Sequence, residues 1–197
     1  MYLIPNGGSG RMIVEAAADG GLSGTSQGEP ALLGPMGSRR EGGCSCGAVR
    51  YALTSEPLVV HCCHCRNCQR QTGSAFVINL LIEADRVELL AGEPLAVDAP
   101  RDDGSTQRIH RCPECQVAVY SEYGRPEVLF VRAGTLDDPS AVTPDVHIYA
   151  RSKAPWVTLP EAARVYDGYY DSREVWPAAS LERLRAVKAA RAATGAA

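Results

Sequence analysis

Apolar and polar positions begin to alternate at residue 49, and the pattern predicts a series of short strands. Residues 49–53 alternate, whereas residues 76–82 form a β-branched and nearly continuous apolar run. Six further strands are expected at residues 87–90, 95–97, 107–111, 117–121, 128–131 and 146–149. Turn residues separate them at Ala91-Gly92, Asp103-Gly104 and Asp137-Asp138-Pro139. Short strands at regular spacing, with few helical stretches among them, predict a mainly β domain.

The two ends of the chain follow other patterns. Residues 1–39 are rich in Gly and Ser and lack periodicity, which predicts a flexible N-terminal extension. Near the other end, Ser180 is expected to cap a helix over residues 181–193, whose apolar face is mostly alanine and should lie loosely on the surface. We therefore expect a domain over residues 40–162 and, after it, a C-terminal tail over residues 163–197 that contains this helix.

Composition narrows the possible partners. The chain has 197 residues, 45% of them apolar, which is enough for one core. Its net charge is −3 and it has no broad basic patch, so we expect no nucleic-acid partner. The longest apolar run is too short to span a bilayer, and no secretion signal is recognisable. We expect no membrane partner and a cytoplasmic location; the oligomeric state does not follow from the sequence.

Eight cysteines stand in close groups, and none stands alone. They are Cys44 and Cys46, then Cys62, Cys63, Cys65 and Cys68, then Cys112 and Cys115. Without a secretion signal, such thiols are expected to be reduced and to bind metal, although an even number also fits a disulfide framework. Thiols one or two residues apart can place two sulfurs about 3.5–4 Å apart around a zinc ion.

The first and last pairs suit a closed zinc site. Glycines flank the first pair and allow backbone turns that direct both sulfurs inward. The last pair, in Cys112-Pro113-Glu114-Cys115, is a knuckle of the type found in zinc ribbons. A redox Cys-x-x-Cys would want a strand-to-helix context that residues 117–120 do not offer. We expect a structural Cys₄ site that contributes folding energy, formed by Cys44, Cys46, Cys112 and Cys115.

The middle group suits an open zinc site. Two ligand sets fit the spacing: Cys63, Cys65 and Cys68, or Cys62, Cys65 and Cys68. Either set leaves a fourth position free for water, hydroxide or a substrate thiolate, where zinc acts as a Lewis acid. His61 and His64 could fill that position, but neither belongs to a separate histidine motif, so we interpret both as neighbours of the site.

Further motifs accompany the cysteines. They are the glycine-flanked residues 42–51, Gly73-Ser74-Ala75-Phe76, His147-Ile148-Tyr149 and Lys153-Ala154-Pro155-Trp156. With the order and spacing of seven thiols, residues 40–160 resemble the glutathione-dependent formaldehyde-activating enzyme family, which includes the domain of centromere protein V. The resemblance implies a β-tent of small antiparallel sheets around two Zn²⁺ per chain. It assigns Cys44, Cys46, Cys112 and Cys115 to the structural ion and Cys63, Cys65 and Cys68 to the open catalytic one. Cys62 is left outside the pattern, as a buried small side chain.

The same resemblance implies carbon–sulfur lyase activity, the reversible joining of formaldehyde to the thiol of glutathione. Arg66, Arg151 and Lys153 are candidates for pairing with the substrate carboxylates. Three thiolates on Zn²⁺ carry a net charge of −1, which weakens the Lewis acid unless positive groups offset it.

Two other functions fit parts of the pattern. A non-catalytic, zinc-stapled binding module would fill both metal sites and ignore small thiols. Residues 1–40 hold only three cations, Arg11, Arg39 and Arg40, which counts against a basic binding arm. A thiol-redox protein using Cys62 or Cys63 would lose zinc on mild oxidation.

Overall fold

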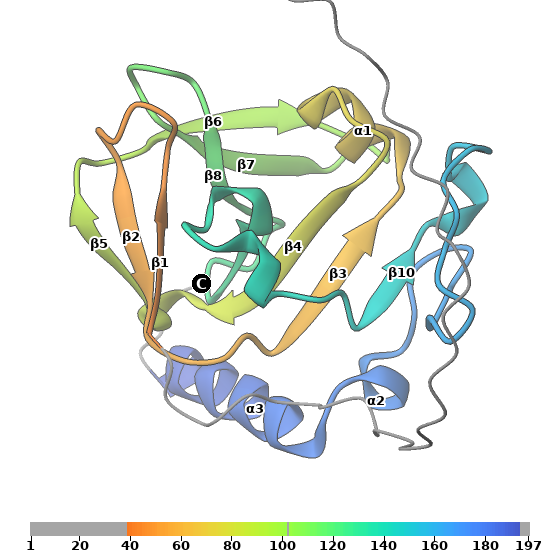
Figure 1. The fold of residues 1–197 in the computed structure, drawn as a ribbon. Helices are drawn as coiled ribbons and strands as arrows, with labels where there is room; N and C mark the ends of the chain where they lie inside the picture. The colour runs from red at the N-terminus through yellow and green to blue at the C-terminus, as the bar shows by residue number, and fades with distance from the viewer. Residues whose placement is uncertain (1–38, 102, 194–197) are drawn as a thin grey trace, which may run out of the picture. The chain divides into compact units, whose positions relative to one another are not determined.

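The computed structural model of this chain describes residues 39–101 and 103–193 (Figure 1). The extension predicted for residues 1–39 lies, apart from Arg39, outside the described residues. The strands are β1 (Arg40–Gly43), β2 (Arg50–Leu53), β3 (Val59–Cys63), β4 (Val77–Glu83), β5 (Val87–Ala91), β6 (Leu95–Pro100), β7 (Thr106–Arg111), β8 (Ala118–Glu122), β9 (Val128–Arg132) and β10 (Val146–Ile148). The α-helices are α1 (Arg66–Thr72), α2 (Ser172–Val175) and α3 (Ala178–Ala193), and 3₁₀ turns lie at Ala84–Arg86, Ala133–Thr135, Pro139–Ala141 and Ala150–Ser152.

The expected mainly β fold with a C-terminal helix is confirmed. The strands form a three-stranded sheet in the order β1-β2-β5 and a seven-stranded sheet in the order β10-β3-β4-β9-β8-β7-β6. Neighbouring strands are antiparallel except β10, which runs parallel to β3. Strands β1 and β3 were not predicted, because neither shows the apolar alternation of the others. They form by pairing with β2 and β4.

Strand β4, in the middle of the seven-stranded sheet, is buried on both faces, which explains its continuous apolar run. Leu80 and Ile82 belong to a first core, which also contains Tyr51 of β2. Leu81 faces a second core, which contains Ile148 of β10 and side chains from the C-terminal tail. A strand covered on both sides can be apolar at every position.

The C-terminal tail is held more firmly than the sequence predicted. Helix α3 begins at Ala178, directly after Pro177, so Ser180 is a buried residue of its first turn and not its cap. The Pro177 carbonyl accepts from the Leu181 amide at 3.1 Å. Leu184 reaches the second core, and Leu181 and Val187 pack against it. Arg183 pairs with Glu83 of β4, and Arg191 pairs with Glu127. An alanine-rich helix is thus anchored by a few apolar side chains and by ion pairs with largely buried carboxylates. The domain boundary at residue 162 stays a prediction.

None of the helices in the described part of the chain has the length and apolar character needed to cross a bilayer.

Candidate metal centres

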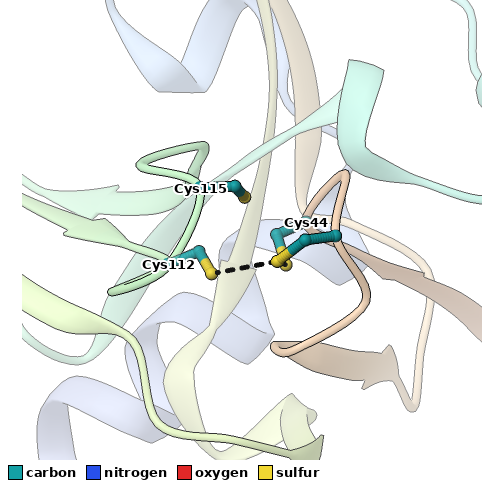
Figure 2. A group of neighbouring side chains, drawn as sticks. Cys44, Cys112 and Cys115 are labelled. Atoms are coloured by element: carbon teal, nitrogen blue, oxygen red, sulfur yellow. Dashed lines mark hydrogen bonds between the residues drawn. The ribbon is translucent and has the colours of Figure 1, made fainter. Parts of the chain in front are cut away.

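The four thiols predicted to form the closed site lie together. Cys44 Sγ is 3.4 Å from Cys46 Sγ, which is 3.7 Å from Cys112 Sγ, and all four sulfurs lie within 4.8 Å of one another. Figure 2 shows Cys112 and Cys115 on one loop, facing Cys44 on another. In a tetrahedral zinc site with bonds of about 2.3 Å, the sulfurs are about 3.8 Å apart. The spacing of this cluster, the tetrad, therefore fits one ion.

Two tight loops direct these sulfurs inward. After Cys44 the chain turns through Gly47, whose φ of 80° is left-handed and suits glycine. The second loop closes through Gln116, also left-handed with a φ of 62°, and its amide donates to the Cys112 carbonyl at 3.0 Å. The backbone amide of Val49 donates to Cys44 Sγ at 3.3 Å, which favours a thiolate there.

The second thiol cluster forms where β3 passes into α1. Cys63 ends the strand, Cys65 is the N-cap of the helix, and Cys68 lies in its first turn, with all three sulfurs within 4.8 Å. The structure thus brings together the set with Cys63 and not the alternative with Cys62. We call Cys63, Cys65 and Cys68 the triad.

A sulfur takes the place that serine or aspartate usually fills at a helix start. The backbone amide of Cys68 donates to Cys65 Sγ at 3.3 Å. Hydrogen bonds from the thiols of Cys63 and Cys68 lower the pKa of Cys65 to about 2, while the hydrogen bonds of Cys63 to Cys65 and Cys68 raise the pKa of Cys63. The helix N-terminus therefore holds a thiolate ready to bind a cation.

A cavity of about 270 Å³ opens beside the triad. Besides the three cysteines, its lining includes His61, Asn67, Asn79, Arg101, Tyr123, Arg125, Phe130, Ile148, Tyr149 and Tyr169. Aromatic rings thus form much of the wall, and the two arginines are its cations among the described residues. An apolar, concave site with a few convergent polar groups is typical of small-molecule binding.

The arginines in the wall are not those that the sequence suggested. Arg66 is exposed and donates to Gln69, Arg151 lies over the Tyr149 ring at 5.8 Å, and Lys153 donates to the Val157 carbonyl at 2.6 Å. None of these three lines the cavity. Arg101 lies in the loop between β6 and β7 and Arg125 in the loop between β8 and β9, and nothing in the sequence signalled that these two loops meet at the triad.

A chain of hydrogen bonds fixes His61 at the cavity wall. Trp176 Nε1–H donates to the Tyr170 hydroxyl at 2.7 Å, and that hydroxyl lies 2.5 Å from His61 Nε2. Indole nitrogen is a donor only, so the tyrosine is left to donate its own proton to His61 Nε2. Burial lowers the pKa of His61 to about 3, so the ring is neutral and carries its proton on Nδ1.

A buried positive charge lies near the triad. Arg132 is only 5% exposed and donates to Asn79, and its Nε is buried without a hydrogen-bond partner among the described residues. Hydrogen bonding from Cys63 and the charge of Arg132 lower the pKa of Cys68, but hydrogen bonding to Cys65 and burial outweigh them and raise this pKa to about 11. A buried guanidinium needs a compensating anion, and a triad with net charge −1 around a divalent ion meets that need. The donor set and its surroundings therefore fit a zinc ion.

The alternative ligand Cys62 and the expected neighbour His64 do not face the triad. Cys62 and His64 are buried on the opposite side of β3 from the triad, next to His147 of β10. All eight cysteines are free, so no disulfide framework is present.

Comparison with known proteins agrees with the motifs. A family model described as glutathione-dependent formaldehyde-activating enzyme matches residues 39–152. A Halomonas elongata protein that carries the same family name is 31% identical over 139 residues, which are 66% of this chain and 88% of that protein. A crystal structure of a Rhodobacter sphaeroides protein is 19% identical and covers 53% of this chain and 91% of its own. Its TM-score of 0.38 is too low to carry an argument.

Proposed function

Because the chain belongs to the glutathione-dependent formaldehyde-activating enzyme family, we propose that it is a zinc-dependent carbon–sulfur lyase. Its substrates would be a small thiol such as glutathione and a small aldehyde such as formaldehyde, joined as an S-hydroxymethyl adduct. The observation that carries this proposal is the triad, three thiols with no fourth cysteine, on the wall of an aromatic cavity.

We assign the two zinc ions to the tetrad and the triad. The tetrad supplies four thiolates and so leaves no position for a substrate, which suits a structural role. The triad would hold its ion with Cys63, Cys65 and Cys68, and there zinc would supply Lewis acidity that keeps a substrate thiol deprotonated near neutral pH. Arg132 offsets the negative charge of three thiolates, which is the condition for a fourth anion to approach.

The cavity side chains would handle the rest of the substrate. Arg101 and Arg125 suit the carboxylates of a tripeptide thiol, and the neighbouring rings suit its chain. His61 presents a neutral imidazole whose Nδ1–H can donate to the aldehyde oxygen. This hydrogen bond would polarise the carbonyl and orient its carbon toward the sulfur.

The reaction balances without an oxidant or reductant. The thiol gives up its proton, the sulfur lone pair forms a bond to the aldehyde carbon, and the carbonyl π pair moves to oxygen, which takes up a proton. In reverse, the hydroxyl loses its proton, the carbon–sulfur bond breaks, and the thiolate leaves.

Exchange between glutathione, formaldehyde and their adduct, followed by NMR, tests this proposal. We expect Cys65→Ala to lower the enzymatic rate by at least about 100-fold, since it removes one ligand of the open site. Ser74→Ala, at an exposed position after α1, is the matched control and should behave as wild type. Wild-type protein with both sites filled and no acceleration over buffer would instead support a zinc-stapled binding module.

A further inference from the structure

A third group of metal-binding side chains lies outside the tetrad and the triad. Cys62, His64 and His147 are 2%, 0% and 9% exposed. Cys62 Sγ lies 3.6 Å from His64 Nε2, which in turn lies 3.1 Å from His147 Nδ1, and the three atoms are all within 4.8 Å. The Cys62 sulfur on β3, a His64 ring nitrogen just after β3 and a His147 ring nitrogen on β10 thus lie close together in the interior.

Strand alternation produces this group. Successive residues of a strand point to opposite faces, so Cys62 points away from Cys63 and the triad. In the parallel pair β3–β10, His147 stands opposite Cys62, and both flanking residues of His147 face the second core. His64 returns to the face of Cys62 two residues later, where its amide donates to the Ile148 carbonyl at 3.0 Å.

The donors have the chemistry and spacing of a transition-metal site. A cysteine sulfur and two imidazole nitrogens are common zinc ligands, and around one tetrahedral ion they lie about 3.3–3.8 Å apart. His64 Nε2 faces both Cys62 Sγ at 3.6 Å and His147 Nδ1 at 3.1 Å. An imidazole nitrogen has one proton or one lone pair to offer and can serve only one of these two neighbours by a hydrogen bond, whereas one ion at their centre would bind all three donor atoms.

We propose that Cys62, His64 and His147 form a third metal site, which binds one late first-row transition-metal ion such as Zn²⁺. One thiolate and two neutral imidazoles leave a divalent ion with net charge +1, opposite in sign to the triad on the other face of β3. The ion links β10 to β3, and β10 carries Ile148 and leads into Tyr149, two residues of the cavity wall. This proposal does not depend on the lyase activity.

Cobalt substitution of the full chain, prepared without oxygen, tests the site. We expect wild-type protein to bind three Co²⁺ per chain at saturation, by elemental analysis. Cys62→Ser and His147→Asn should each bind two. His110→Asn is the matched control, because His110 is half-buried and pairs with Glu122 elsewhere in the sheet; it should still bind three. A wild-type stoichiometry of two overturns the proposal, as does a third ion that persists in both variants.

A second readout works even if those variants fail to fold. The tetrad and the triad contain sulfur ligands alone, and large contact shifts of imidazole ring N–H protons require a direct Co–N bond, so two such signals should appear in wild-type NMR spectra only if the third site is filled. Contact-shifted ring N–H signals from two histidines support the site. Their absence at saturating Co²⁺ overturns it.

Discussion

The tetrad and the triad are built from the same side chain but in opposite ways. The tetrad joins two loops far apart in the sequence, and it is partly open to solvent, with Cys46 exposed. The triad comes from six consecutive residues, and Cys63 and Cys68 are each 4% exposed. The more buried cluster is nevertheless the one proposed for chemistry. What distinguishes a working site is therefore an unfilled ligand position beside a cavity, and not access to bulk water.

The largest effect is expected from breaking the tetrad. Cys112→Ser removes a buried ligand from a cluster that ties two loops together, so metal binding energy is lost from folding. We expect Tm to fall by about 10 °C or more, since about 4 kcal/mol corresponds to roughly 8–16 °C in a chain of this size. Thermal unfolding by circular dichroism measures it. Cys65→Ser should lower Tm by much less; equal losses would mean that both clusters are structural.

The rates at which a chelator removes zinc should distinguish the triad from the tetrad. A site with three protein ligands offers a chelator a free position, whereas a four-thiolate site does not. Because the proposed third site also has only three protein ligands, the release is measured in Cys62→Ser, which lacks that site. There we expect zinc to leave in two phases, the faster by about tenfold or more and absent once Cys65→Ser is added. A colorimetric chelator follows the release. A fast phase that survives the Cys65→Ser change would contradict the assignment of an open site.

Substrate recognition should depend on the cavity arginines. Arg125→Gln removes a cation from the wall, and a charge-assisted hydrogen bond is worth about 1.5–3 kcal/mol, so we expect KM for glutathione to rise by about tenfold or more. Steady-state kinetics with a thiol that lacks carboxylates supplies the comparison, and its KM should not change. Arg66→Gln, outside the cavity, is the matched control. Similar KM values for Arg125→Gln and wild type would remove Arg125 from the site.

The smallest effect is expected from Tyr170, whose hydroxyl holds His61 of the cavity wall. Tyr170→Phe removes the hydroxyl shared by His61 and Trp176 and leaves buried partners unpaired, at a cost of about 1–3 kcal/mol. We expect Tm to fall by roughly 2–12 °C. Tyr166→Phe, in the neighbouring ring, is the control. A Tm that stays at the wild-type value would show that this hydrogen-bond chain adds no stability.

Local spacing made the triad predictable, since its thiols lie within six residues, and it made each half of the tetrad predictable as a pair. The meeting of the two pairs of the tetrad depends on the fold and was expected only because one pair alone cannot complete four ligands. The strands with clear alternation were predictable for the same local reason. Helix α1 was not, because its residues are polar and its cap is Cys65, a residue type that rarely signals a helix start. Its role as a cap is visible only from the contact with the Cys68 amide.

The features that depend on long-range strand pairing could not be predicted from the sequence. Arg101 and Arg125 meet at one cavity because the loops that carry them are brought together by the sheet order. Cys62 was interpreted as a buried bystander, and it is buried, but the parallel register of β10 adds His147 beside it. No local pattern fixes a register between residues so distant in the chain.

Tyr169 lies in a different part of the sequence from the proposed zinc ligands. The proposed zinc ligands all fall within residues 39–152, the range matched by the family model, whereas this tyrosine of the cavity wall lies beyond it. The proposed zinc ligands and part of the proposed substrate pocket are thus carried by separate stretches of polypeptide. Exchanging the tail that carries Tyr169 is therefore a route to redesigning which thiol is accepted while the ion-binding machinery stays in place.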